Sequence, residues 1–201
     1  LYPAITETIY HLEAQEQLGG RSDYCLYPQT AMSLPSFGTS LTPNYEAIAR
    51  ERPKVILTAE SKGTPVTQLQ RIAPVNQLPW LTIEEVTDSI VKLGVLISKE
   101  QEAKLLSEKI RTTLQSKARS DSPSMLILMQ GSDIKKGQLW FMKHDSLHGT
   151  AIEAAGYHNA APNETKGPPS MSVEQLLAQD PDIILFLTSN TISKEEENSL
   201  V

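Results

Sequence analysis

The chain contains one short sequence pattern twice, and this repeat constrains the fold more than any other feature. The first copy covers 44–57 and the second covers 172–185. Each begins with a residue suited to cap a helix, Asn44 or Ser172, and each has a glutamate two positions later, where the helix dipole favours a carboxylate. A proline then ends the helical pattern, and an apolar run typical of a buried strand follows. The repeat therefore predicts a helix–loop–strand unit in each of two similar α/β halves.

The clearest helical pattern lies between the two copies. Thr82 and Glu85 have the spacing of a capping box, and apolar residues recur behind them every three or four positions. Ser98 and Gln101 repeat this arrangement and predict a helix over 98–117, about 30 Å long, which is enough to cross a small domain. We place the boundary between two lobes on this helix. The expected organisation is an N-terminal lobe over 1–97, a connecting helix over 98–119 and a C-terminal lobe over 123–201.

Strand patterns alternate with helical patterns on both sides of the connecting helix, which is typical of parallel α/β layers. The expected fold class is α/β, with two Rossmann-like lobes joined by one long α-helix. Helices are also expected at 6–18, 65–72 and 150–155, and strands at 75–78, 125–129, 139–142 and 183–187. Three strands make a small sheet in the second half, so we expect an incomplete second lobe with either an exposed apolar patch or a partner that covers it.

Composition and motifs exclude several classes of protein. The net charge of −6 and the absence of a basic run give no support to binding of nucleic acid or of an anionic membrane surface. The longest apolar runs, 125–129 and 183–187, are too short to span a bilayer. Cys25 is the only cysteine, so no internal disulfide is possible. The sequence has no nucleophile elbow, phosphate-binding loop or dinucleotide fingerprint, and we expect neither catalysis nor a cofactor.

Two histidines have a spacing that suits metal ligands. His144 and His148 are four residues apart, which places two side chains on one face of a helix. No third ligand is obvious, and Gly149 weakens the helical pattern, so we assign no metal site. His11 and His158 stand alone and are expected at the surface.

Aromatic residues and the two repeated glutamates are the candidate site residues. Ligands of α/β proteins bind at the carboxyl ends of strands. Large aromatic side chains in or beside the loops that follow strands are Tyr2, Tyr24, Tyr27 and Trp140. Glu46 and Glu174 occupy equivalent positions in the two copies of the repeat, which favours a paired role over two unrelated surface charges.

Several stretches, in order and at matching spacing along nearly the whole chain, resemble the periplasmic substrate-binding proteins of vitamin B12 and iron-siderophore ABC importers. They are 3–7 (PAITE), 22–28 (SDYCLYP), 44–48 (NYEAI), 53–57 (PKVIL), 156–159 (GYHN), 172–176 (SVEQL) and 181–184 (PDII).

This resemblance implies two α/β lobes joined by one long helix, with the ligand held in the cleft between them. It also implies that Glu46 and Glu174 dock onto arginines of a membrane permease, since charge-assisted contacts orient a partner. A cleft tyrosine of the family falls on Tyr24, and Trp140 lies near another aromatic cleft position. Three further aromatic positions fall on residues that are not aromatic here: Ser40, Thr58 and Pro168. We therefore expect a more polar pocket than a B12 site.

The predicted function is that of a periplasmic solute-binding component that captures a metal chelate, namely a corrinoid, a ferric siderophore or haem, and delivers it to an ABC permease. The residues expected to line the ligand are Tyr2, Tyr24, Ser40, Glu60, Gln130, Trp140, Pro168 and Ser189. We expect a monomer in the periplasm, or an extracytoplasmic lipoprotein, whose leader and outer ends are missing from this sequence. The alternatives are a bilobal metal-binding enzyme or metallochaperone, and a family member that acts only in protein interaction.

Overall fold

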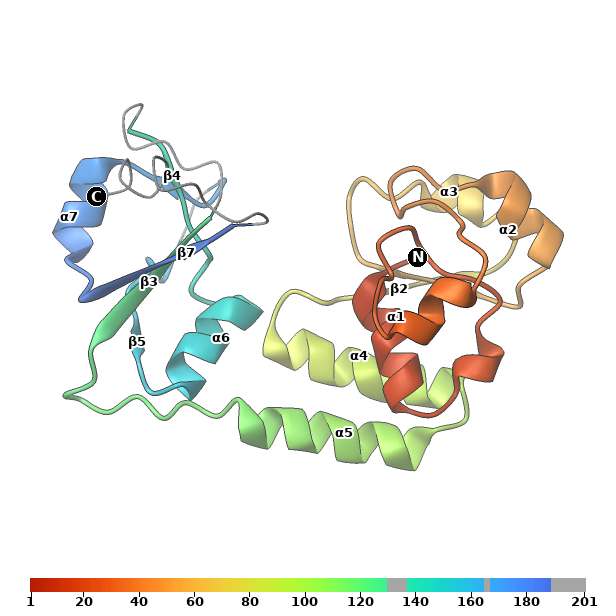
Figure 1. Cartoon of the computed structure of the whole chain (residues 1–201), viewed down its shortest axis with the longest axis horizontal. Coiled ribbons are helices and arrows are strands. Elements are labelled where there is room, and N and C mark those ends of the chain that lie inside the picture. The colour runs from red at the N-terminus through yellow and green to blue at the C-terminus, as the bar shows by residue number, and fades with distance from the viewer. Residues whose placement is uncertain (130–136, 165–166, 189–201) are drawn as a thin grey trace. The chain divides into compact units, whose positions relative to one another are not determined.

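The computed structural model describes residues 1–129, 137–164 and 167–188, and the chain divides into two compact units. Unit 1 is Leu1–Ile110 and unit 2 is Arg111–Val201. Figure 1 shows helices packed with short strands in each unit. None of the described helices is both long enough and apolar enough to cross a membrane.

Unit 1 is built on a parallel pair of strands, in which Ile56 of β1 lies opposite Val75 of β2. Its core is formed by apolar residues from the strands and from the helices and loops around them, among them Phe37, Ile48 and Leu69. The elements are α1 (Pro3–His11), α2 (Tyr45–Glu51), β1 (Ile56–Ala59), α3 (Val66–Leu69), β2 (Val75–Leu78) and α4 (Ile83–Leu96), with short 3-10 turns at Gln15–Gln17 and Gln29–Ser33. Helix α5 (Glu100–Thr113) begins in unit 1 and ends in unit 2.

Unit 2 is built on a three-stranded parallel sheet in the order β5-β3-β7, beside an antiparallel pair of β4 and β6. Leu126, Leu139 and Phe141 are among its most deeply buried side chains. The elements are β3 (Ser124–Met129), β4 (Leu139–Trp140), α6 (Leu147–Ala154), β5 (His158–Asn159), β6 (Ser170–Met171), α7 (Val173–Gln179) and β7 (Ile183–Leu187).

The structure confirms the repeated helix–loop–strand unit. The Asn44 side chain accepts a hydrogen bond from the Ala47 N–H (3.0 Å), and the Ser172 hydroxyl accepts one from the Gln175 N–H (3.3 Å). Each helix ends at a left-handed residue directly before the proline, Arg52 with φ 53° or Asp180 with φ 43°, and a strand, β1 or β7, follows.

The second capping box predicted for the connecting helix is wrong, whereas the first is present. The Thr82 hydroxyl accepts from the Glu85 N–H at 3.2 Å, and the Glu85 carboxylate accepts in return from the Thr82 N–H. Ser98, however, has φ 57° and closes α4, because Ser98 N–H donates to Val95 and Lys99 N–H to Gly94. This left-handed closing motif leaves Ser98 unable to cap the next helix. Helix α5 therefore covers Glu100–Thr113 instead of 98–117.

Other predicted elements differ from the observed ones at their ends. Helix α1 begins at Pro3 and ends at His11 instead of covering 6–18, because a proline fits the first helical position and Thr6 lies inside the helix. The helix expected at 150–155 begins at Leu147, since Ser146 caps it through the Gly149 N–H. The helix expected at 65–72 and the strand expected at 139–142 are shorter, at Val66–Leu69 and Leu139–Trp140.

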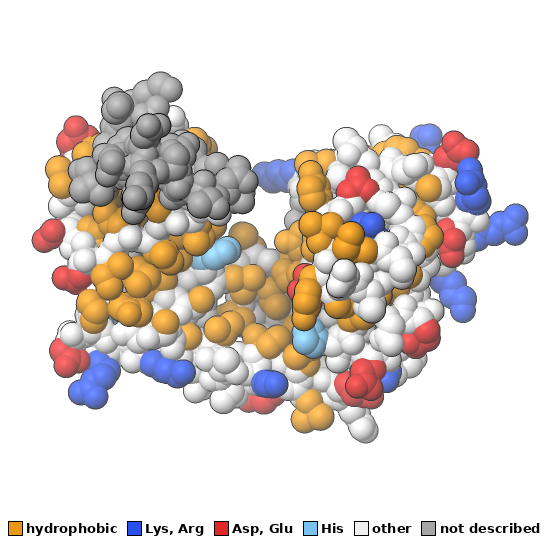
Figure 2. Space-filling view, viewed as in Figure 1, with side chains coloured by type: hydrophobic (Ala, Val, Ile, Leu, Met, Phe, Trp, Pro, Cys, Tyr) orange, Lys and Arg blue, Asp and Glu red, His pale blue; other side chains and the backbone are white. Residues whose placement is uncertain are grey.

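Unit 2 exposes apolar side chains along β7, at one end of its described three-stranded sheet. Strand β7 pairs with β3 on one side, and the side chains of Ile184 and Leu185 are 50% and 43% exposed. These residues are consecutive, so they lie on opposite faces of the sheet. Figure 2 shows hydrophobic side chains at the surface of this unit.

Candidate ligand-binding site

Aromatic side chains gather at the carboxyl ends of the two strands of unit 1. Strand β2 ends at Leu78, and two residues later Trp80 meets Tyr2 edge to face, with ring centroids 6.3 Å apart and planes at 62°. Glu60 follows β1 directly, and its N–H donates to the Leu78 carbonyl at 2.9 Å. The structure thus brings two predicted site residues, Tyr2 and Glu60, to this end of the sheet together with Trp80, where ligands of α/β sheets bind.

Tyr24 is held beside the first helix by the cysteine that follows it. The Cys25 thiol is fully buried and lies 3.2 Å from both the Thr6 hydroxyl and the Ser22 hydroxyl. Thr6 belongs to α1, so these contacts fix the Tyr24 loop to that helix. The Tyr24 side chain itself is 70% exposed, which leaves its ring accessible to a ligand.

The loop that carries Ser40 lies next to the Tyr24 loop. The Asp23 N–H donates to the Gly38 carbonyl at 2.9 Å, and the Arg21 N–H donates to the Pro35 carbonyl. Ser40 is half-buried two residues beyond Gly38. By contrast, Thr58 is fully buried within β1, so this position faces the interior of unit 1.

A cavity of about 440 Å³ in unit 1 is separate from these residues. It lies between α1, α2 and β1, its walls are mostly apolar, and none of the predicted ligand-lining residues contributes to it. The Leu1 backbone nitrogen donates to the Leu57 carbonyl at 2.6 Å beside this cavity.

In unit 2, Trp140 and Pro168 lie in one antiparallel pair of chain segments. Trp140 of β4 is opposite Ser170 of β6, and the Ser170 N–H donates to the Pro168 carbonyl at 2.8 Å. The structure therefore brings together two of the residues predicted in this unit. The other two, Gln130 and Ser189, lie outside the described residues.

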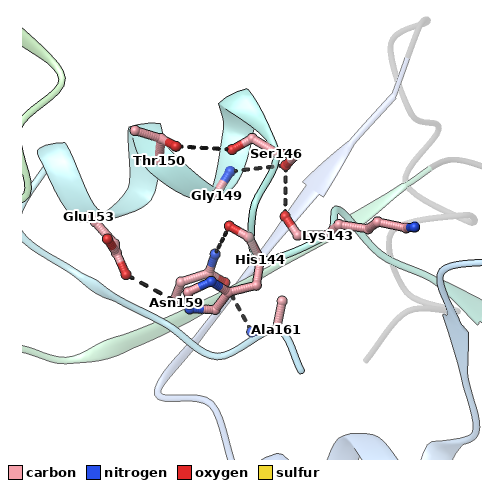
Figure 3. A network of polar contacts seen from close by, with 8 residues as sticks. All are labelled: Lys143, His144, Ser146, Gly149, Thr150, Glu153, Asn159 and Ala161. Atoms are coloured by element: carbon pink, nitrogen blue, oxygen red, sulfur yellow. Dashed lines mark hydrogen bonds and ion pairs between the residues drawn. The ribbon is translucent and has the colours of Figure 1, made fainter. Parts of the chain in front are cut away.

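A network of polar contacts fixes the segment between β4 and α6 (Figure 3). The Asn159 side-chain amide donates to the His144 carbonyl at 3.2 Å, and its oxygen accepts from the Ala161 N–H at 2.9 Å. The His144 imidazole Nε2 lies 3.8 Å from the Glu153 carboxylate. A side chain on Gly149 would collide with the His144 carbonyl, so the close approach of this segment to α6 requires a glycine there.

The structure does not support His144 and His148 as two ligands on one helix face. His144 precedes α6 and contacts Glu153, while His148 is an exposed residue in the first turn of α6. Within the described part of the chain, no group of three or more His, Cys, Asp or Glu side chains has an arrangement that would hold a metal ion. His11 and His158 are exposed, as expected.

Each of the two repeated glutamates is exposed in the first turn of its helix, but their surroundings differ. Glu46 forms an ion pair with Arg50, in which Nη2 and Oε1 are 3.0 Å apart. A hydrogen bond from the Ser172 side chain, and next one from its own backbone, lower the pKa of Glu174.

Two residues described above were not identified from the sequence, Trp80 in the aromatic contact of unit 1 and Asn159 in the polar network of unit 2. Trp80 could have been found, because it comes two positions after a predicted strand, where ligand-binding residues are expected. Asn159 gave no such signal, since its partner His144 is 15 residues away and the contact depends on how β5 and α6 pack.

Together these features define a class of protein. At the strand ends of unit 1, Trp80 meets Tyr2 beside the exposed Glu60, and Tyr24 is exposed in a further loop. This arrangement is typical of a ligand-binding protein.

The chain belongs to the periplasmic binding protein family, whose sequence profile matches residues 1–200. The family consists of binding proteins rather than enzymes, as the resemblance predicted. A relative from Bacillus subtilis (strain 168), named "Putative ABC transporter substrate-binding lipoprotein YhfQ", is 28% identical over 168 residues, which cover 78% of this chain and 52% of the relative. A cobalamin-binding protein of Halobacterium salinarum is 25% identical over 200 residues, covering 92% of this chain and 52% of the relative. The chain thus spans about half the length of the curated relatives it matches.

A solved structure shows the same fold. The periplasmic haem-binding protein HutB of Vibrio cholerae superposes with a TM-score of 0.76 and is 24% identical, covering 92% of this chain and 73% of that protein. The α/β architecture predicted from the sequence is confirmed by this similarity over most of the chain.

Proposed function

We propose that this chain is part of the solute-binding component of an ABC importer, that it captures a metal chelate, and that it delivers the chelate to a membrane permease. The chelate is a corrinoid, a ferric siderophore or haem. The observation that carries this proposal is the contact between Tyr2 and Trp80 at the strand ends of unit 1, together with the 70% exposed Tyr24 in the loop that Cys25 ties to α1. Membership in the periplasmic binding protein family supports the transport role.

Aromatic side chains suit such a ligand because they provide large, rigid contact surfaces. In the proposal, Tyr2, Tyr24 and Trp80 contact the apolar parts of the chelate. Ser40 and Glu60 provide the polar groups that orient it, in keeping with binding sites that combine apolar walls with a few polar contacts. The residues proposed to contribute from unit 2 are Trp140 and Pro168, together with Gln130 and Ser189.

Two relatives support parts of this proposal. The Halobacterium relative is named a cobalamin-binding protein, which supports a corrinoid as one candidate ligand. The Bacillus relative is named a lipoprotein, which supports a place outside the cytoplasmic membrane. Glu46 and Glu174 would then dock on the permease, because exposed carboxylates in matching positions suit two cationic contact points.

The test is a titration of the purified chain with cobalamin, haem and a ferric siderophore, followed by tryptophan fluorescence. The chain has two tryptophans, one in each unit, so Trp80→Phe and Trp140→Phe variants report on each unit separately. We expect at least one chelate to quench Trp80 in the Trp140→Phe variant with saturation. Free N-acetyltryptophanamide controls for absorption by the chelate. Quenching that never saturates with any of the three chelates would contradict the proposal.

A further inference from the structure

The two copies of the repeat differ at the surface positions next to the first-turn glutamates. Residues three and four positions apart are neighbours on the surface of a helix. Counted from each glutamate, the neighbours form two triplets, and all six side chains belong to exposed residues. The α2 face is Glu46, Ala49 and Arg50, and the α7 face is Glu174, Leu177 and Ala178.

The α2 face carries an ion pair. Arg50 Nη2 donates to Glu46 Oε1 at 3.0 Å, and the two side chains are 76% and 85% exposed. The net charge of this triplet is therefore zero. A guanidinium has five N–H donors, and within the described part of the chain Arg50 makes one side-chain hydrogen bond, so it can also contact an acceptor on a partner.

The α7 face carries an acid beside an apolar side chain. Arg50 corresponds to Ala178 in the second copy, and within the described residues no lysine or arginine forms an ion pair with Glu174. Leu177 corresponds to Ala49 and is 71% exposed. This triplet therefore has a net charge of −1 and an accessible apolar group.

We propose that the two faces dock on two chemically different contact points. The α7 face fits an arginine or lysine of the partner that lies next to an apolar pocket, which receives Leu177. The α2 face fits a cation for Glu46 and a carboxylate or carbonyl acceptor for Arg50. This inference rests on the proposed docking of Glu46 and Glu174, and it adds that the two halves of the permease differ and that the chain docks in one orientation only. In the reversed orientation Arg50 would face the arginine or lysine meant for the α7 face, and this like-charge contact discriminates against that orientation.

Cross-linking measures this orientation. Glu51 and Gln179 are exposed and occupy equivalent positions in the two copies, while the native Cys25 is buried. A Glu51→Cys or Gln179→Cys variant is labelled with a photoreactive group and bound to the ABC permease in nanodiscs. After cross-linking, mass spectrometry identifies which half of the permease is attached to the labelled cysteine. We expect each cysteine to label one half only. In a swap variant that carries Ala49→Leu, Arg50→Ala, Leu177→Ala and Ala178→Arg, we expect the two labelled halves to be exchanged.

Affinity measurements with single variants test the two faces separately. We expect Arg50→Ala to weaken permease binding about two- to fivefold, as for an exposed ion pair, and Leu177→Ala to weaken it about tenfold through lost apolar burial. Matched controls are Arg71→Ala and Leu105→Ala, which remove exposed side chains of the same types elsewhere and should leave the affinity unchanged.

Three outcomes would overturn the inference. Labelling of both halves equally, or a pattern that the swap leaves unchanged, contradicts the asymmetric docking while leaving the docking role intact. A chain that binds a chelate but is cross-linked to neither half contradicts the docking role as well. Chelate affinity is measured on the same variants, so a failure of ligand binding is distinguished from a failure of docking.

Discussion

Removing the Asn159 side chain should destabilise unit 2 by about 2 kcal/mol. The side chain makes two hydrogen bonds, one to the His144 carbonyl at 3.2 Å and one from the Ala161 N–H at 2.9 Å (Figure 3). Each such bond contributes about 1 kcal/mol, and a buried group left without a partner adds to the loss. Asn159 and His144 are half-buried and water can reach them in part, so we use the sum of the two bonds.

Urea unfolding of an Asn159→Ala variant measures this loss. A Trp80→Phe background leaves Trp140 of unit 2 as the fluorescent probe. Asn159→Asp keeps the acceptor for Ala161 but replaces the donor to His144 with a carboxylate oxygen, so it should also be destabilised. Asn163→Ala, at an exposed position, is the matched control and should change the free energy of unfolding by less than about 0.5 kcal/mol. Equal free energies for Asn159→Ala and Asn163→Ala would refute the role assigned to this network.

Three other perturbations have defined outcomes. Gly149→Ala should destabilise unit 2 by about 1 kcal/mol in the same unfolding assay. The collision with the His144 carbonyl costs about 2 kcal/mol, and a gain of about 1 kcal/mol in helix propensity offsets part of it; a more stable variant would contradict this. Thr82→Ala removes the cap of α4 and should cost about 1 kcal/mol, measured with Trp80 in a Trp140→Phe background; no change would show that the capping box is dispensable. Hydrogen bonds from the Ser124 backbone and then its hydroxyl lower the pKa of Asp182, so the carboxylate stabilises the folded state above the ordinary pKa of 3.8, and this stabilisation is lost as pH falls through the lowered value. The stability difference between the wild-type chain and Asp182→Asn should therefore be constant from pH 7 to about 4 and shrink below that in an acid titration, and a difference that grows on acidification would be the contrary result.

Local signals explain which elements could be predicted from the sequence. The repeat was predicted correctly because capping by Asn44 and Ser172, and the prolines that follow, act within a few residues. The start of α5 was not, because Ser98 fits two roles and the structure uses it to close α4. A capping pattern alone does not distinguish a residue that begins one helix from a residue that ends the helix before it.

The candidate site was predictable in part for a similar reason. The rule that ligands bind at strand ends predicts that residues directly after strands, such as Glu60, belong to the site. The contact between Tyr2 and Trp80 joins residues that are far apart in the sequence, and the position of the exposed Tyr24 depends on the burial of Cys25. Such contacts follow from tertiary packing, which a local pattern does not encode.

Isothermal titration of the chain with cobalamin, haem and a ferric siderophore tests the central claim most directly, when it compares the wild-type chain with Tyr24→Ala and Tyr45→Ala. Tyr24 is proposed to contact the ligand, whereas Tyr45, also exposed, is the first residue of α2 and is not among the proposed ligand contacts, so it serves as the control. We predict saturable binding of at least one chelate, about tenfold weaker for Tyr24→Ala through the loss of an aromatic contact, and unchanged for Tyr45→Ala. Absence of saturable binding to all three chelates, or equal weakening by both substitutions, would contradict the account.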